Sequence, residues 1–224
     1  MIELAPLWLT LKLALSTTLI LFVVAIPLAT WFSGKKTALK VIIESIVTLP
    51  LVLPPTVIGF YLLVAFSPGN AFGKWLEQWA DIRLVFSFGG LLIASVVYSL
   101  PFMVHPIRSG LSSLPPSLKE ASYSLGKTKW QTLLKVLLPN IKPSLLTGLV
   151  LTFAHTVGEF GVVLMIGGNM PGKTRTASIA IYDEVQAFHY REANVYALIL
   201  LVLSFIILLI MYSFNGKMKQ VKFY

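Results

Sequence analysis

Long uncharged stretches constrain the fold of this chain most strongly. Four of them carry no charged side chain at all: residues 13–34, 45–73, 84–107 and 193–216. A fifth stretch, residues 143–172, contains only Glu159. A helix needs about 20 mostly apolar residues to cross the roughly 30 Å hydrocarbon core of a bilayer. Each stretch is long enough to span, so the sequence predicts an integral membrane protein.

Composition supports this prediction and excludes several other classes of protein. Of the 224 residues, 56% are apolar and 12% are charged, which leaves too little polar surface for a soluble domain. The absence of cysteine excludes a disulfide scaffold and a cysteine-ligated metal centre. We therefore expect no metal and no cofactor in this chain, and no nucleic-acid partner, because the net charge of +9 has to be explained by membrane topology.

The predicted fold is all-α, a polytopic transmembrane helical bundle. Irregular backbone cannot face lipid, and the chain lacks the alternating pattern of a membrane β-barrel. About five spans are expected, at residues 8–32, 41–66, 84–108, 143–166 and 194–214. The first stretch lacks the basic leader and the small-residue cleavage site of a secretory signal, so we expect it to be retained.

Basic residues are unevenly distributed among the predicted loops. Twelve of the 18 follow spans 1, 3 and 5: Lys35, Lys36, Lys40, Arg108, Lys119, Lys127, Lys129, Lys135, Lys142, Lys217, Lys219 and Lys222. Cytoplasmic loops carry the excess of lysine and arginine. The sequence therefore predicts an external N-terminus, a cytoplasmic C-terminus and a basic cytoplasmic tail at residues 214–224.

The predicted cytoplasmic loop between spans 3 and 4 has strong local signals. Ser117 and Glu120 fit a capping box, which begins a short helix, and Gly126 suits a left-handed exit from that helix. Thr128 to Gln131 fits a second capping box, and we expect Pro139 to close the second helix. Two short helices joined by a glycine could rest on anionic lipid or could dock a soluble partner.

The spacing within this loop favours docking. Glu120, Ala121, Ser122, Gly126, Val136, Leu138 and Pro139 stand in the register of the EAA loop of bacterial ABC importer permeases, which the segment resembles. Ser122 and Val136 depart from that pattern, and both changes are conservative in size. The resemblance implies a type I ABC importer permease whose coupling loop, residues 111–139, inserts its short helix into a cleft of an ATP-hydrolysing subunit.

Two further features are candidates for the passage or its gate. Pro50, Pro54 and Pro55 must kink or break span 2, and the freed carbonyl groups should face protein or water. This break either shapes the bundle or lines the passage.

Span 4 places His155 and Glu159 four residues apart, which on a continuous helix puts them on one face. An ionisable side chain at membrane depth usually marks a pathway or a buried pair. A structural hydrogen bond, a gate, and a proton relay or metal site are the alternatives. Gly158 and Gly161 would let another helix approach closely.

The predicted outer loops contain three signals. Residues 68–83 carry Trp75 and Trp79 and fit a short interfacial helix, and residues 176–188 have helical potential. Residues 167–174 satisfy the pattern of a phosphate-binding P-loop. We reject that interpretation, because the motif needs a strand before the loop, and here a transmembrane helix leads into it.

Further sequence blocks extend the resemblance to almost the whole chain, residues 7–213. They are Leu49–Pro55, Val157–Gly161, Thr174–Thr176 and Ile179–Tyr182, and together they resemble the molybdate permease of ABC importers. The resemblance implies a bacterial or archaeal cytoplasmic-membrane protein that transports molybdate or tungstate and is not itself an enzyme. It also implies a homodimer, two ATPase subunits that bind ATP and magnesium, and an extracytoplasmic binding protein.

Two alternatives remain at this stage. A sulfate or thiosulfate ABC permease shares the first block and the coupling loop. A proton-coupled secondary transporter would rest on His155, Glu159 and the broken span 2, but it would have no reason to keep the EAA register. No cluster of buried arginine or lysine that could hold a dianion tightly is evident in the sequence.

Overall fold

The computed structural model describes the backbone of residues 3–218 and the side chains of residues 3–210 and 212–213. All regular structure in this described part is helical, which confirms the predicted all-α fold. The predicted basic tail, 214–224, is described only as the backbone of its first five residues, and residues 219–224 lie outside the described range.

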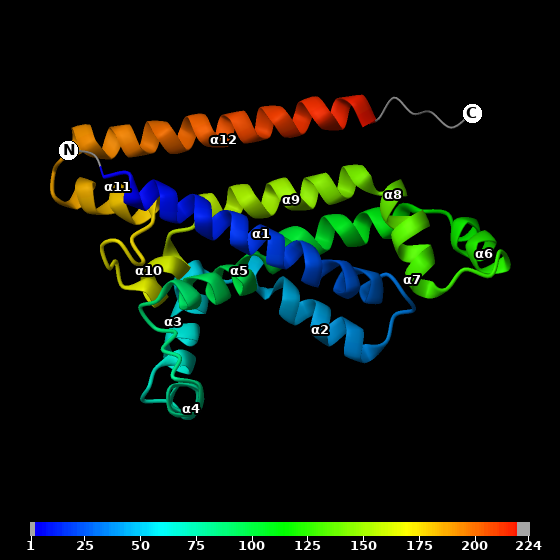
Figure 1. Cartoon of the computed structure of the whole chain (residues 1–224), viewed down its shortest axis with the longest axis horizontal. Coiled ribbons are helices and arrows are strands. Elements are labelled where there is room, and N and C mark those ends of the chain that lie inside the picture. The colour runs from blue at the N-terminus through cyan, green and yellow to red at the C-terminus, as the bar shows by residue number, and fades with distance from the viewer. Residues whose placement is uncertain (1–2, 219–224) are drawn as a thin grey trace.

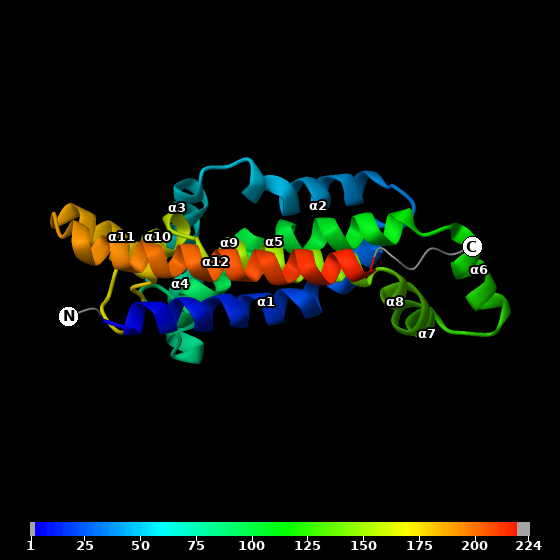
Figure 2. The ribbon, with the colours of Figure 1, turned by 90° about the horizontal axis from the view of Figure 1, so that it is seen from above.

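Three long helices set the length of the molecule. They are α1 (Ala5–Phe32), α5 (Phe88–Ser113) and α12 (Tyr190–Met218), and each contains a segment long and apolar enough to cross a membrane. Helices α1 and α5 pack closely against each other and against α9 (Lys142–Val157), while α12 lies along α9 (Figures 1 and 2). Up to five spans are counted when bent helix pairs are included, in agreement with the predicted number.

Span 2 is broken rather than merely kinked. Helix α2 (Ala38–Thr48) and a short 3₁₀ turn (Leu49–Leu51) precede α3 (Pro55–Phe66). The helix axis bends by 112° between these two parts. Pro54 and Pro55 lack the amide hydrogens that would continue the helical ladder. The kink or break predicted from the prolines within span 2 is confirmed, and it takes the form of a break.

Span 4 is broken as well, which the sequence analysis did not foresee. Helix α9 ends at Val157, residues 158–160 are not helical, and α10 (Gly161–Gly167) follows. The expected continuous helix over 143–166 is therefore wrong. Gly158 ends α9 and Phe160 precedes α10, so the chain changes direction between them.

The two breaks come together because small residues let α3 and α10 approach closely. A Cβ atom at Gly161 would lie 2.7 Å from the Cβ of Pro55, and one at Gly59 would lie 2.7 Å from the Cβ of Met165. The close approach predicted at Gly161 is confirmed. It is wrong at Gly158, where only backbone atoms of the same helix lie within 4 Å.

Helices α4 (Ala71–Ala80) and α11 (Ala177–Gln186) confirm the two helices predicted in the loops at 68–83 and 176–188. Helix α11 lies at one end of the bundle, and α4 projects from its side beyond α3 (Figure 1). At the opposite end lie α6 (Pro116–Ser124), α7 (Lys129–Thr132), a π-helical turn (Leu133–Leu137) and α8 (Leu138–Asn140) (Figure 1). Pro139 does not close the second loop helix as expected, because the helical turns run through it to Asn140.

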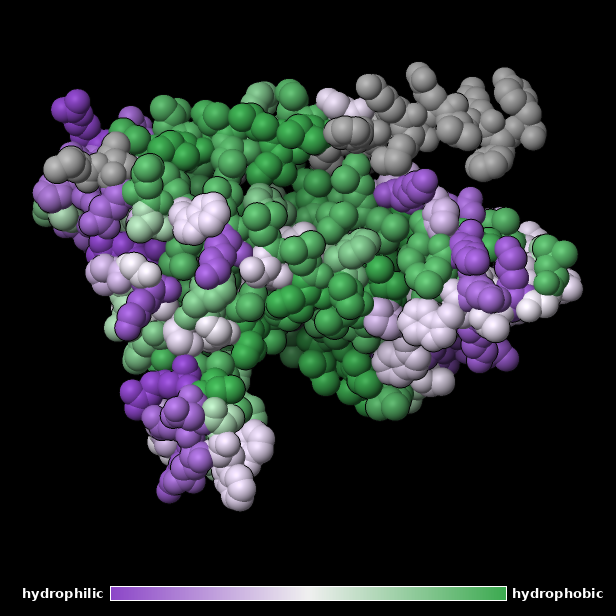
Figure 3. Space-filling model, in the orientation of Figure 1, coloured by the Kyte–Doolittle hydropathy of each residue, from purple (hydrophilic) through white to green (hydrophobic). Residues whose placement is uncertain are grey.

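The core divides into two apolar clusters with a polar layer between them. One cluster is centred on Leu91 and Ile166, the other on Leu21 and Ile107. Buried hydroxyl groups from α1, α5 and α9 separate the clusters: Thr17, Thr18, Ser95, Ser99, Thr152 and Thr156. The exposed surface is predominantly apolar along the length of the bundle, as a lipid-facing or subunit-facing surface requires (Figure 3).

The two glycines of the second break provide a matched test of this packing. Gly161→Ala forces its methyl group against Pro55, and overpacking of this kind costs about 1–3 kcal/mol. In Gly158→Ala the added methyl group has space, and the backbone φ of −86° suits any residue. The stability of this variant should therefore stay close to that of the wild type. Thermal unfolding of the purified protein in detergent measures both. Equal midpoints for the two variants would contradict the close packing of α3 on α10.

Candidate functional site

The loop between α5 and α9 folds into a compact knob, residues 115–140, held together by specific turns. Gly126 has a φ of +72°, its amide donates to the carbonyl of Tyr123 at 2.9 Å, and the amide of Lys127 donates to the carbonyl of Ser122 at 3.2 Å. These two bonds form a Schellman turn, which favours glycine at the left-handed position. The left-handed exit predicted at Gly126 is confirmed.

One of the two predicted capping boxes is present. Thr128 Oγ1 accepts a hydrogen bond from the amide of Gln131 at 3.2 Å, and the Thr128 amide donates to Gln131 Oε1 at 3.0 Å. The box at Ser117 and Glu120 is wrong, because α6 begins at Pro116 with Pro115 as its N-cap and no side-chain cap. Proline is favoured in the first helical position, which moves the start of the helix and leaves Ser117 inside its first turn.

A buried pair of hydroxyl groups joins the two arms of the knob. Ser122 Oγ lies 2.8 Å from Thr132 Oγ1, and both side chains are buried. The serine that departs from the EAA pattern therefore has a polar partner on α7. Glu120 and Ala121 are exposed on the other side of α6, where they are free to meet a partner surface.

The tip of the knob exposes large apolar side chains. Leu125 is 77% exposed, Trp130 62% and Leu134 56%. None of the three is among the residues predicted for the coupling loop, because the exposure of a single side chain leaves no mark in the local sequence pattern.

The base of the knob is anchored in the core of the bundle. Leu138 packs against the cluster that contains Ile141, Met103 and Ile107. Val136 lies in the π-helical turn just before it, and its carbonyl accepts from Asn140 Nδ2 at 2.7 Å. The helical segment that ends at Asn140 meets α9 at 80°. The base of the knob is therefore fixed in the core at the point where α9 begins.

Three of the five passage candidates line one pocket at the point where the two breaks meet. We call it the break pocket; it has a volume of about 530 Å³, and Pro55, His155 and Glu159 are among its lining residues. Pro50 is buried near the first break and Pro54 is exposed, and neither lines this pocket.

His155 and Glu159 are each held by a serine of α5, not by each other. Ser95 Oγ donates to Glu159 Oε2 at 2.9 Å, and Ser99 Oγ lies 3.1 Å from His155 Nδ1. The two residues do not share a face of one continuous helix, because α9 ends at Val157 between them. Instead, Ser95 and Ser99 on successive turns of α5 hold Glu159 and His155 near each other.

Glu159 connects three elements of the fold. Its carboxylate reaches Ser95 on α5, and its backbone carbonyl accepts from Ser178 Oγ of α11 at 2.6 Å. The side chain is only 5% exposed, and Oε1 has no hydrogen-bond partner among the described residues. No group of three metal-ligating side chains occurs in the described range either. Glu159 therefore fastens the second break to its neighbours.

The loop that resembles a P-loop in sequence is closed by its own side chains. Helix α10 leads into it, as expected, and Thr174 Oγ1 donates to the carbonyl of Gly167 at 2.6 Å and accepts from the amide of Met170 at 2.9 Å. Arg175 pairs with Asp183 at 3.1 Å and donates to Asn169 at 2.9 Å. These bonds fix the loop against α11.

Comparison with known proteins identifies the family. Residues 10–220 match the family described as the binding-protein-dependent transport system inner membrane component. The chain belongs to this family. The molybdenum transport system permease protein ModB of Azotobacter vinelandii is 44% identical over 211 residues, covering 94% of this chain and 93% of that protein. The Haemophilus influenzae ModB is 34% identical over 97% of this chain and 96% of that protein.

A sulfate permease is similar over a shorter length. The sulfate transport system permease protein CysT of Escherichia coli is 35% identical over 176 residues, which cover 79% of this chain and 62% of that protein. The resemblance to molybdate permeases that the sequence blocks indicate is thus confirmed. The similarity to the sulfate permease covers a smaller share of that protein's length.

Solved ABC importers share the fold. A chain of a bacterial transporter that imports the acidic polysaccharide alginate superimposes with a TM-score of 0.79 at 19% identity, covering 98% of this chain and 80% of that chain. The inward-facing MetNI methionine transporter gives 0.73 at 19% identity, covering 95% and 94%. The predicted ABC importer permease fold is confirmed.

One predicted capping box of the knob is present and the other is absent, and this difference can be tested. Thr128→Ala removes a side-chain cap, at a cost of about 1 kcal/mol, and should speed hydrogen exchange at the amides of α7. Ser117→Ala removes no cap and should leave exchange in α6 unchanged. Hydrogen-exchange mass spectrometry of the two variants measures the difference. Faster exchange in α6 after Ser117→Ala would restore the rejected box.

Proposed function

We propose that the chain is the membrane-spanning subunit of an ATP-driven oxyanion importer, with molybdate as its main substrate and tungstate as a second one. The observation that carries this proposal is the knob, a rigid docking element anchored in the bundle, in a chain that is closely similar to molybdate permeases. The chain moves the anion, and ATP hydrolysis takes place in a separate subunit that binds ATP and magnesium.

The partners follow from the geometry of the knob. The exposed side chains of Leu125 and Trp130 suit a groove on a soluble ATPase subunit, and Glu120 and Ala121 lie exposed beside them. Each chain carries one knob, so a pair of ATPase subunits calls for two copies of the chain, a homodimer. An extracytoplasmic binding protein delivers the anion at the opposite end, where α11 lies.

The orientation in the membrane follows from the distribution of charge. The knob, the end of α1 and the end of α12 lie at one end of the bundle, and the N-terminal end of α1 lies at the other (Figure 1). Because basic loops remain in the cytoplasm, this arrangement favours a cytoplasmic knob and an external N-terminus. The cytoplasmic membrane of a bacterium or archaeon is the membrane in which such importers work.

The proposed passage for the anion lies next to the two helix breaks. Pro55, His155 and Glu159 line the break pocket, while Pro50 and Pro54 shape the turn that leads to it. Glu159 acts in gating and not in anion binding, because an ionised carboxylate would repel a dianion. The hydrogen bonds from Ser95 and Ser178 hold the gate in the state described here.

Reconstitution separates molybdate import from its two alternatives. Proteoliposomes containing the chain and its ATPase subunits, with ATP in the lumen, should take up labelled molybdate only when the binding protein is added outside. Sulfate uptake at equal concentration should be much weaker. Preferential uptake of sulfate would assign the chain to sulfate permeases, and molybdate uptake driven by a proton gradient without ATP would indicate a secondary transporter.

The turn at Gly126 provides a direct test of coupling. Gly126→Pro removes the amide that donates to Tyr123 and imposes a φ near −65°, so ATP hydrolysis should continue while uptake per ATP falls at least tenfold. Gly126→Ala meets no neighbouring atom within 4 Å and should give a smaller loss, because it only strains the left-handed turn. Both variants should still insert into the membrane. Normal uptake by Gly126→Pro would contradict the lever role of the knob.

A further inference from the structure

Pockets follow one another along the face that α2, α5 and α9 share. A middle pocket of about 640 Å³ lies between Phe102, Leu51 and Leu151, next to the break pocket. The ring of Phe102, which lines the middle pocket, stacks on His155 of the break pocket with the centroids 3.9 Å apart. Thr48 lines both the middle pocket and a third pocket of about 500 Å³, which lies toward the knob end of α2.

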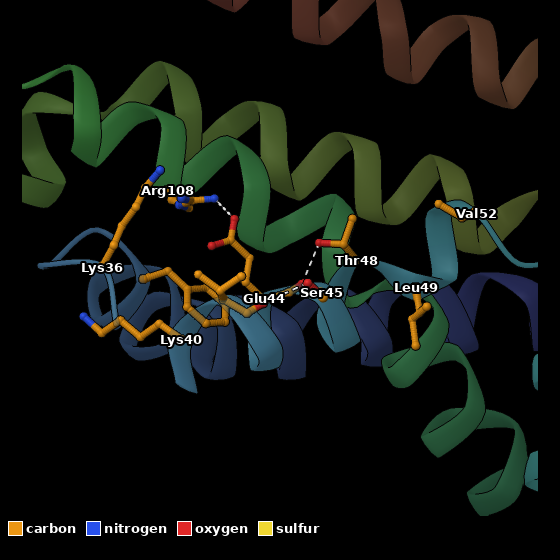
Figure 4. A pocket seen from close by; sticks show the side chains of 10 residues that line it. Lys36, Lys40, Glu44, Ser45, Thr48, Leu49, Val52 and Arg108 are labelled. Atoms are coloured by element: carbon orange, nitrogen blue, oxygen red, sulfur yellow. Dashed lines mark hydrogen bonds and ion pairs between the residues drawn. The ribbon is translucent and has the colours of Figure 1, made fainter. Parts of the chain in front are cut away.

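This third pocket, here called the basic pocket, is lined by three cationic side chains from two parts of the sequence. Lys36 precedes α2, Lys40 lies in its first turn, and Arg108 comes from α5 (Figure 4). Glu44 of α2 forms an ion pair with Arg108, and both side chains are about one quarter exposed. The four side chains together carry a formal charge of +2.

The basic pocket extends from the residues before α2 to the first break. Leu49 and Val52, which belong to the 3₁₀ turn and its end, line the pocket together with the three cations. Irregular backbone within a membrane is tolerated only where it faces protein or water, which favours a pocket that faces water over one that faces lipid chains.

We propose that Lys36, Lys40 and Arg108 form an exit site for the doubly charged oxyanion at the cytoplasmic end of the passage. The inference rests on the proposed function and adds the place where the anion leaves. Its charge of −2 matches the net charge of the pocket in magnitude, and Thr48 lines both this pocket and the middle pocket.

The site is built for weak binding, as an exit requires. Its cations are partly exposed, so water and salt screen their attraction for the anion. Glu44 competes with the anion for Arg108 and restores the ion pair when the anion leaves. An ion that passes through a membrane protein must be attracted enough to enter each site and weakly enough to leave it.

Chemical footprinting tests occupancy directly. The complex of the chain with its ATPase subunits, purified in neutral detergent, is treated with an amine-reactive reagent, and each lysine is followed by mass spectrometry. Millimolar molybdate should slow the modification of Lys36 and Lys40, whereas Lys35, an exposed neighbour that does not line the pocket, should react at an unchanged rate. Chloride at equal ionic strength should protect none of them.

Two outcomes would overturn the proposal. One is equal reactivity of Lys36 and Lys40 with and without molybdate. The other is protection of these lysines in nanodiscs of phosphatidylglycerol, absent in phosphatidylcholine, without any protection by molybdate. That second result would assign the pocket to the phosphate of a lipid headgroup.

Transport provides an independent readout with a matched control. Molybdate placed in the lumen of the proteoliposomes should occupy the exit site and inhibit uptake. In the double variant Lys36→Gln, Lys40→Gln the half-inhibitory concentration should rise about tenfold, because two partly screened cations are lost. Lys35→Gln should behave as the wild type. An unchanged half-inhibitory concentration in a complex that imports molybdate normally would overturn the exit site alone, whereas a wild-type complex that imports no oxyanion would refute the proposed function.

Discussion

The need to cover interrupted backbone within a membrane governs this structure. Two of the predicted spans break, at Leu49–Pro54 and at Gly158–Phe160, and lipid cannot satisfy the amide and carbonyl groups that each break releases. The chain brings the two breaks together through the close contact of Gly161 with Pro55. Serine side chains from α5 and α11 bind Glu159 at the same place. The pocket that results is a consequence of this arrangement, since irregular backbone is tolerated only where it faces protein or water.

Sequence reasoning succeeded where a single residue type determines the backbone. Three prolines were enough to predict the first break, and Gly126 and the Thr128 box were enough to predict the turn and the second arm of the knob. It failed where neighbouring signals compete: Pro116 begins α6 before Ser117 can cap it. The second break had no proline to reveal it, and Gly158 was assigned to packing although it ends a helix.

The remaining features depend on contacts between distant parts of the chain, which no local pattern records. Arg108 joins Lys36 and Lys40 in one pocket only because α5 packs beside α2. Similarly, the spacing of His155 and Glu159 suggested a shared helical face. Their alignment in fact comes from Ser95 and Ser99 on a different helix. Local sequence thus specified the elements of the site, and tertiary packing specified their chemistry.

Helix α9 connects the two functional regions mechanically. It begins beside the anchored base of the knob at Ile141 and ends at the break that Glu159 holds, and its 16 residues span about 24 Å. Gly148 brings α9 close to Met103 of α5, where an added Cβ would lie 3.0 Å from the sulfur. Beyond the breaks, α3 and α10 pack against each other and also against α5. Helix α5 is therefore the element that holds the two sides of both breaks together.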